Sequence, residues 1–271
     1  PSHPPRAPLS GDAMASSSET LFRAAFVELA LTAQIIAFPD TLSLPPRLEP
    51  DGLALFLDLD GVLAPIVDRP EDVGPDPRRN LILGRLAERM GRRVAIISGR
   101  TIAQVSAITE NAIAAVAGVH GLERRNAMGE VMSAVPDPEL GEAAAVFRAL
   151  ARAQPQLIVE DKGLSVALHY RALPSACEAV REAARRIEAA TDLVLQEGDM
   201  VAELRTPGQD KGKSVSAFLR EAPFDGATPV FVGDDLTDED GFAAAARLGV
   251  PRGVPHAGVA PSGTTKLAYL S

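Results

Sequence analysis

The stretch that decides the fold lies at residues 53–61, which read Leu-Ala-Leu-Phe-Leu-Asp-Leu-Asp-Gly. The first five residues are all apolar, a run typical of a strand that is buried on both faces of a sheet. The run stops abruptly at Asp58, and Asp60 follows two residues later. Two carboxylates directly after a buried strand are costly unless a cation compensates their charge. The segment therefore predicts a strand that leads into a chemically active end, against the simpler alternative of a turn with an Asx cap.

The same pattern recurs further along the chain, where short apolar runs alternate with helical patterns. Helices are predicted at residues 78–90, 101–110 and 214–219, and buried strands at residues 94–97, 114–119 and 229–232. Strands that alternate with helices imply right-handed crossovers and a parallel sheet. We therefore expect an α/β fold with a Rossmann-like core.

A different pattern occupies the middle of the chain. Short strands are predicted at residues 157–160, 164–170, 194–196 and 201–204, and helices at residues 139–153 and 175–190. Because the parallel pattern stops before this region and resumes after it, we interpret the region as a small α+β unit inserted into the core.

These patterns divide the chain into four parts. Residues 1–49 are expected to be a disordered N-terminus with a candidate helix and a proline-rich linker. Residues 50–120 and 206–271 form the two parts of the core, and residues 121–205 form the insert. Residues 249–271 are atypical, because they show no clear buried strand and would leave an edge of the sheet open.

Composition and charge exclude several classes of protein. The 271 residues carry 27 Lys and Arg against 36 Asp and Glu, a net charge of −9, which argues against a general nucleic-acid binder. The single cysteine, Cys177, rules out an internal disulfide and suits a reducing compartment. The most apolar early stretch, residues 24–38, is interrupted by Glu28 and Gln34, so no membrane span is predicted. We expect a cytoplasmic monomer.

The carboxylates after residue 57 suit magnesium and phosphorus chemistry. Mg²⁺ takes oxygen ligands and is usually held by one or two carboxylates together with phosphate and water. A carboxylate can also attack phosphorus and form an aspartyl phosphate. Asp58 and Asp60 are therefore candidates for both roles.

Three further polar motifs adjoin predicted strands or helices. They are Ser98-Gly99-Arg100, Asp210-Lys211-Gly212-Lys213, and the run at residues 233–240, in which five acids fall within seven residues. Taken alone, the first motif is better explained as an ordinary helix N-terminus, and the second as a solvated charge. Helix capping does not need five acids, so a cation site is the better interpretation of the third. Open parallel sheets bind ligands at the carboxyl ends of their strands, where these motifs are expected to meet.

Together and in this order, the four motifs resemble those of the haloacid dehalogenase superfamily of phosphatases. The resemblance implies that Asp58 is the nucleophile and Asp60 the general acid/base. It implies that the phosphate is bound by Ser98, Gly99, Arg100 and Lys211, and that Mg²⁺ is held by Asp58, Asp60, Asp234, Asp235 and Asp238. A mutase would keep the same core motifs, so these motifs alone leave hydrolysis and transfer open.

Motifs at residues 118–123, 160–162, 167–171 and 203–205 resemble those of the trehalose-6-phosphate phosphatases, over about residues 46–248. The resemblance implies that the insert is a cap domain whose polar groups bind the sugar. The implied sugar-binding residues are His120, Glu123, Lys162, His169, Arg171 and Glu203. A site that pairs with sugar hydroxyls rejects analogues that leave its own polar groups unpaired. For His169 and Arg171, a structural role inside the cap is an equal alternative.

The sequence thus predicts a phosphoric monoester hydrolase that uses Mg²⁺ and acts on a small-molecule sugar phosphate. The resemblance implies that the substrate is trehalose 6-phosphate and that the reaction is the last step of trehalose biosynthesis. One alternative is the same class of enzyme acting on sucrose phosphate or mannosyl-glycerate phosphate. The other is a catalytically inactive regulatory module, which the atypical C-terminus favours and the retained acidic motifs oppose.

Overall fold

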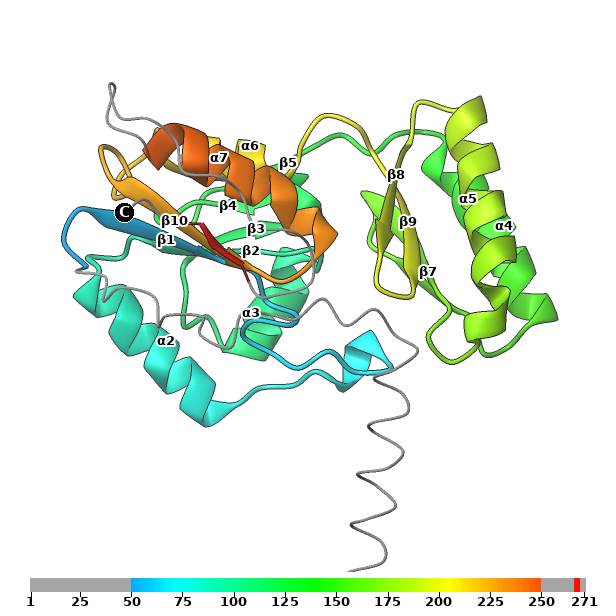
Figure 1. The fold of residues 1–271 in the computed structure, drawn as a ribbon, viewed down its shortest axis with the longest axis horizontal. Coiled ribbons are helices and arrows are strands. Elements are labelled where there is room, and N and C mark those ends of the chain that lie inside the picture. The colour runs from blue at the N-terminus through cyan, green and yellow to red at the C-terminus, as the bar shows by residue number, and fades with distance from the viewer. Residues whose placement is uncertain (1–49, 250–265, 269–271) are drawn as a thin grey trace, which may run out of the picture. The chain divides into compact units, whose positions relative to one another are not determined.

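The computed structural model describes residues 50–249 and 266–268, and its core is a sheet of seven strands (Figure 1). Across the sheet the order is β11, β10, β1, β2, β3, β4 and β5, with bounds Lys266–Ala268, Thr228–Gly233, Leu53–Leu57, Val94–Ile97, Ala115–Gly118, Glu123–Arg125 and Val131–Ser133. Strands β10, β1, β2 and β3 run parallel, and the other three join antiparallel. The predicted parallel-sheet core is confirmed.

Strand β1 lies between β10 and β2 and is covered on both faces, as its apolar run predicts. Helices α2 (Pro77–Arg89) and α3 (Ile102–Thr109) cover one face, and α6 (Lys211–Phe218) and α7 (Glu239–Gly249) cover the other (Figure 1). Leu57 belongs to the apolar cluster of α2 and α3, whereas Phe56 belongs to that of α6 and α7. Successive residues of a strand point to opposite faces, so both must be apolar here.

The helices that lead into the strand ends begin at side-chain caps. Thr101 and Gln104 form a reciprocal capping box at the start of α3. Asp210 caps α6, with its carboxylate accepting from the Lys213 N–H at 2.6 Å. Helix α6 therefore begins at Lys211 and not at the predicted residue 214, which places the Lys211 side chain in the first turn.

A second sheet of four antiparallel strands forms the insert. Its order is β6 (Ile158–Asp161), β7 (Ser165–His169), β9 (Val201–Arg205) and β8 (Val194–Gly198). Helices α4 (Leu140–Ala153) and α5 (Cys177–Ala190) lie side by side over one face (Figure 1). Phe147 and Leu168 are fully buried in the cluster between helices and sheet. The predicted α+β unit inserted into the core is confirmed.

The hairpin of β4 and β5 corrects one expected boundary. The sequence predicts that the insert begins at residue 121, yet β4 pairs with β3 and β5 pairs with β4. The core sheet therefore extends to Ser133. Each of these strands has three residues, and β4 reads Glu-Arg-Arg, so no apolar run announces them.

In the C-terminal region, the structure describes one short strand, β11. Strand β11 pairs antiparallel with β10, with Leu267 opposite Val232. The outer edge of β10 is therefore paired, in contrast to the open edge that the sequence predicts. The remainder of the atypical segment, residues 250–265 and 269–271, lies outside the described residues, as do the expected disorder, helix and linker of residues 1–49.

The helices of the described residues are short. The longest, α4 and α5, have 14 residues each. A bilayer span needs about 20 apolar residues, and no helix in residues 50–249 has both the length and the apolar character to cross a membrane.

Candidate active site

The carboxyl end of β1 carries the two aspartates that the sequence singles out. Asp58 is 5% exposed, and its N–H continues the strand ladder by donating to Val232 O at 2.9 Å. Gly61 follows with a φ of 80°, and a Cβ at this position would overlap the carboxylate of Asp234. Glycine is therefore needed for a left-handed backbone and for the close approach of a side chain that follows β10.

Lys211 joins two buried carboxylates at this strand end. Its Nζ lies 3.1 Å from Asp58 Oδ1 and donates to Asp238 Oδ1 at 2.7 Å. Burial alone would lower the pKa of Lys211, but Asp58 and Asp238 raise it above its ordinary value. Lys211 is therefore a buried cation beside Asp58, where it can offset the charge of a phosphoryl group.

Asp238 organises the loop after β10. Its Oδ2 accepts from the N–H groups of Asp234 at 3.0 Å and of Asp235 at 3.1 Å. Asp235 in turn caps η4 (Leu236–Asp238) by accepting from the Thr237 N–H at 3.3 Å. Both oxygens of Asp238 and one of Asp235 thus already have protein donors, which leaves these two predicted metal ligands in a supporting position.

The same strand ends carry a surplus of negative charge. Asp58, Asp234 and Asp238 offer carboxylate oxygens that all lie within 4.8 Å of one another, and among the described residues Asp234 Oδ1 is buried without a hydrogen-bond partner. Burial raises the pKa of Asp58 to about 7, Lys211 opposes this rise, and Asp238 adds to it. Burial and Asp238 likewise raise the pKa of Asp234. The residues fit a divalent cation, with Asp58 and Asp234 best placed to bind it.

The segment after β2 carries three of the predicted phosphate ligands, and they have different environments. Ser98 is buried, its Oγ accepts from the Arg100 N–H at 3.2 Å, and it does not line the cleft. Gly99 and Arg100 do line the cleft. The Arg100 guanidinium, however, is forked on Asp60, with Nε donating to Oδ2 and Nη2 donating to Oδ1, each at 2.8 Å. The carboxylate of Asp60 is therefore engaged by Arg100.

Lys162 and Glu203 of the insert reach the core. Lys162 Nζ donates to Gly99 O at 2.9 Å and to the two oxygens of Glu203 at 3.1 and 3.2 Å. Glu203 also accepts from Ser165 Oγ at 2.5 Å and lies 3.3 Å from His120 Nε2. Burial alone would raise the pKa of Glu203, but Lys162 and His120 hold it below its ordinary value. Both predicted sugar ligands are beside the cleft, bound to each other.

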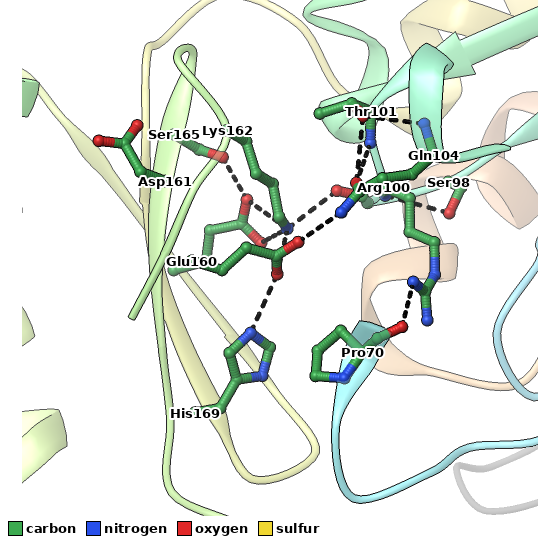
Figure 2. Close-up of polar contacts among 12 residues, drawn as sticks. Pro70, Ser98, Arg100, Thr101, Gln104, Glu160, Asp161, Lys162, Ser165 and His169 are labelled. Carbon is green, nitrogen blue, oxygen red and sulfur yellow. Dashed lines mark hydrogen bonds and ion pairs between the residues drawn. The ribbon is translucent and has the colours of Figure 1, made fainter. Parts of the chain in front are cut away.

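A second polar contact runs from Gln104 through Glu160 to His169 (Figure 2). Glu160 Oε1 accepts from Gln104 Nε2 at 2.9 Å, and Glu160 Oε2 lies 3.0 Å from His169 Nε2. Burial opposes ionisation of Glu160, but His169 and Lys162 lower its pKa to about 2. Arg171 lines the cleft and donates to Asp199 Oδ2 at 2.8 Å. For His169 and Arg171, the structural partners that the sequence allows are present.

His120 and Glu123 have different environments despite their proximity in sequence. His120 is buried, lines the cleft and has a φ of 55°, and burial lowers the pKa of its imidazole. Glu123 lies in β4 and does not line the cleft. Its Oε1 accepts from the Ile102 N–H at the start of α3. The Glu123 carboxylate is therefore engaged at the start of α3, and its sugar contact stays a prediction.

One cleft collects most of the predicted side chains from the core and the insert. The predicted residues that line it are Asp58, Asp60, Gly99, Arg100, His120, Lys162, His169, Arg171, Glu203, Lys211, Asp234 and Asp235. Ser98, Glu123 and Asp238 act from behind this lining. The arrangement places buried acids and a lysine at the strand ends, in one cleft with polar groups of the insert.

The family model described as trehalose-phosphatase matches residues 56–268. The chain belongs to the trehalose-phosphatase family. A trehalose-6-phosphate phosphatase of Escherichia coli strain K12 is 40% identical over 201 residues, covering 72% of this chain and 74% of that protein. A probable trehalose-phosphate phosphatase of Sinorhizobium fredii is 35% identical over 202 residues, covering 73% and 76%.

A solved relative supports the fold. The C-terminal domain of a C. albicans trehalose-6-phosphate phosphatase has a TM-score of 0.63 at 22% identity, covering 75% of this chain and 80% of that one. Membership of the trehalose-phosphatase family confirms the predicted class of enzyme, a phosphoric monoester hydrolase. The solved structure also supports the predicted α/β fold, a parallel-sheet core with an inserted α+β unit.

Several polar groups of the cleft were not predicted from the sequence. Asp68, Glu160, Gln196, Asp199 and Thr237 line it without having been assigned a role. Glu160 could have been found, because it begins the 160–162 motif and ends the strand predicted at residues 157–160. Of the others, Gln196 lies within β8 and Thr237 within η4, and Asp68 and Asp199 lie on loops. Only the fold sets the direction of these side chains.

Proposed function

We propose that this chain hydrolyses trehalose 6-phosphate to trehalose and phosphate through an aspartyl phosphate on Asp58. The observation that carries the proposal is Asp58 itself, buried at the base of the cleft with Lys211 Nζ 3.1 Å away. A carboxylate so placed can attack phosphorus, because Lys211 offsets the negative charge of the incoming phosphoryl group. The family membership and the names of the relatives support trehalose 6-phosphate as the substrate.

The acidic cluster supports Mg²⁺ as the cofactor, held by Asp58 and Asp234. The unpartnered Oδ1 of Asp234 and the surplus of carboxylates are the features that fit it. When bound, the ion would offset charge on the phosphoryl oxygens and favour the ionised form of Asp58.

The chain's own residues account for the proton and phosphoryl transfers. An oxygen of Asp58 forms a bond to phosphorus while the bond from phosphorus to the sugar O6 breaks, and Asp60 gives its proton to that leaving oxygen. Asp60, now a carboxylate, takes a proton from a water that attacks phosphorus. This second attack breaks the bond to Asp58 and releases phosphate. Lys211, held by Asp238, stabilises the transferring group in both steps.

The cap supplies the sugar side of the site. His120, Lys162, His169, Arg171 and Glu203 line the cleft and carry donors and acceptors that suit sugar hydroxyls. Lys162 and Glu203 are bound to each other and to the core in this structure, so sugar binding would exchange those bonds for bonds to hydroxyls. The monomeric state stays a prediction.

The test is release of phosphate from a panel of sugar phosphates, with Mg²⁺ and with a chelator. The panel contains trehalose 6-phosphate, sucrose 6-phosphate, mannosyl-glycerate phosphate and p-nitrophenyl phosphate. We expect the highest kcat/KM on trehalose 6-phosphate and loss of turnover with the chelator. A higher kcat/KM on another sugar phosphate would overturn the substrate, and no turnover on any member would favour an inactive regulatory module. Full turnover in chelator would overturn the metal assignment.

A further inference from the structure

The starting observation is how Arg100 is held. Its side chain is largely buried, and three of its hydrogen bonds go to one carboxylate: Nε to Asp60 Oδ2 at 2.8 Å, Nη2 to Asp60 Oδ1 at 2.8 Å and Nε to Asp60 Oδ1 at 3.1 Å. Nη1 donates to Pro70 O at 2.8 Å (Figure 2). This is the bidentate geometry in which arginine fixes the plane of a carboxylate.

The backbone of Arg100 is fixed as firmly as its side chain. Its N–H donates to Ser98 Oγ at 3.2 Å, and its carbonyl accepts from the Val119 N–H at 2.9 Å. The preceding carbonyl, of Gly99, accepts from Lys162 of the cap. Protein partners therefore hold both the backbone and the guanidinium of Arg100, so the guanidinium is already paired without a bound anion.

Asp60 depends on this one partner. Within the described part of the chain, the side-chain donors that bond to the Asp60 carboxylate all belong to Arg100. Asp60 is also more open than its neighbour, since 35% of its side chain is exposed against 7% for Asp58. A half-exposed carboxylate without Arg100 would have several rotamers available.

We propose that Arg100 is a positioning residue for Asp60 and not a ligand of the phosphate. The proposal rests on the proposed function, in which Asp60 gives a proton to the sugar O6 and then takes one from water. Each transfer needs an Asp60 oxygen within hydrogen-bond reach of the reacting oxygen, about 2.6–3.2 Å. A carboxylate has about four lone-pair sites, so the fork sets the orientation and still leaves sites for O6 and water.

The hydrogen bond from Arg100 to Pro70 O links the bidentate Arg100–Asp60 pair to a wall of the cleft. Pro70 lines the cleft, as do Ile66, Val67 and Asp68 of the same loop. Because Arg100 holds Asp60 with one side of the guanidinium and Pro70 O with the other, it sets the distance between the acid/base and this wall of the cleft.

The first experiment separates positioning from phosphate binding. Arg100→Gln keeps a planar polar side chain but loses the fork, and we expect kcat on trehalose 6-phosphate to fall about 10- to 100-fold, the usual effect of removing a group that orients a reacting residue. The inhibition constant of inorganic phosphate should stay within about twofold of the wild type. A rise of about tenfold or more in that constant would overturn the proposal, because it would make Arg100 a phosphate ligand.

The second experiment tests whether Arg100 acts through Asp60. Arg100→Gln is combined with Asp60→Ala, and p-nitrophenyl phosphate turnover is measured for each variant. Since the fork has no carboxylate to position in Asp60→Ala, the second substitution should change kcat by less than about twofold. An equal loss in both backgrounds would overturn the proposal. If Asp60→Ala falls below detection, the phosphate inhibition constant decides.

Two further variants control for structure. Arg124 makes a bidentate pair of the same kind with Glu221, with distances of 2.7 and 2.8 Å, outside the cleft. Arg124→Gln should lower the thermal midpoint as much as Arg100→Gln does and leave kcat unchanged. Arg100→Lys keeps the charge without the fork, so it should restore little of kcat. Full activity in Arg100→Lys would overturn the positioning role.

Failure of this proposal is distinguishable from failure of the proposed function. If wild-type protein releases no phosphate from trehalose 6-phosphate while its p-nitrophenyl phosphate activity depends on Asp58, the substrate is wrong and the Arg100 tests still apply to that ester. If wild-type turnover is normal and the phosphate constant rises in Arg100→Gln, only the positioning role is wrong.

Discussion

The two charged clusters of the cleft are built in opposite ways. At the strand ends, Asp58 and Asp234 have pKa values above their ordinary range, and within the described residues Asp234 Oδ1 has no partner. In the cluster that joins cap and core, Glu160 and Glu203 have pKa values below their ordinary range, because cations and donors surround them. The first cluster thus keeps an unpaired carboxylate oxygen beside Lys211, whereas the carboxylates of the second are paired with protein groups.

This difference indicates how the two clusters would work. Buried carboxylates with raised pKa values gain most from a bound cation, which is the expected state of a site that waits for Mg²⁺ and phosphate. Glu160 and Glu203 already accept hydrogen bonds from protein donors, so sugar binding to them would break some of these bonds. The strand-end cluster would therefore set the rate of chemistry, and the cap cluster would set which substrates are accepted.

The largest expected effect comes from breaking the strand-end cluster at Asp58. Asp58→Asn removes the nucleophile with little change in volume, and we expect kcat to fall by about 10⁴-fold or more on every substrate. Phosphate release measures it, with circular dichroism to check folding. Asp51→Asn, at an exposed position before β1, is the control. Unchanged turnover in a folded Asp58→Asn protein would rule out the aspartyl phosphate.

Breaking the cap cluster should give a smaller and selective effect. A hydrogen bond to a buried charged group is worth roughly 1.5 to 3 kcal/mol, so Lys162→Met or Glu203→Gln should lower kcat/KM on trehalose 6-phosphate about 10- to 100-fold. p-Nitrophenyl phosphate lacks the sugar, and its kcat/KM should change little. Parallel losses on both substrates would mean that these residues hold the cap in place and do not read the sugar.

The low pKa of Glu160 predicts that this cluster stabilises the fold in a pH-dependent way. A carboxyl whose pKa falls from 4.5 in the unfolded chain to about 2 in the folded chain stabilises the fold above pH 4.5, and this stabilisation is lost as pH falls toward 2. Glu160→Gln should therefore lower the free energy of unfolding at pH 7, by at most about 3 kcal/mol, and by less at pH 3.5. Urea unfolding at both pH values measures it. An equal loss at the two values would show that Glu160 acts by packing.

The smallest expected effect tests whether Glu123 acts at the start of α3 or on the sugar. Glu123→Gln keeps an oxygen that can accept from the Ile102 N–H, and Glu123→Ala removes it. Loss of such a helix cap costs about 1 kcal/mol, so only the alanine variant should unfold at lower urea. The ratio of kcat/KM on trehalose 6-phosphate to that on p-nitrophenyl phosphate should stay the same in both. A selective loss on the sugar phosphate would assign Glu123 to the sugar site.

Strong local patterns predicted most of the fold. Strands at residues 53–57 and 94–97 were located from apolar runs, because both faces of a parallel sheet are buried. The β4–β5 hairpin was not, since β4 is polar and half-buried. The start of α6 was placed three residues late, because nothing in Lys-Gly-Lys shows that Asp210 already caps the helix.

By itself, the sequence determined which residue types lie at the strand ends, because apolar runs and the acids that follow them are local features. It could not determine which of those side chains are already engaged. Arg100 lies 40 residues from Asp60, Lys162 lies 41 residues from Glu203, and Glu123 lies 21 residues from Ile102. Whether a charge faces a ligand or a partner depends on distances across the sheet and between cap and core, and only the tertiary structure sets those distances.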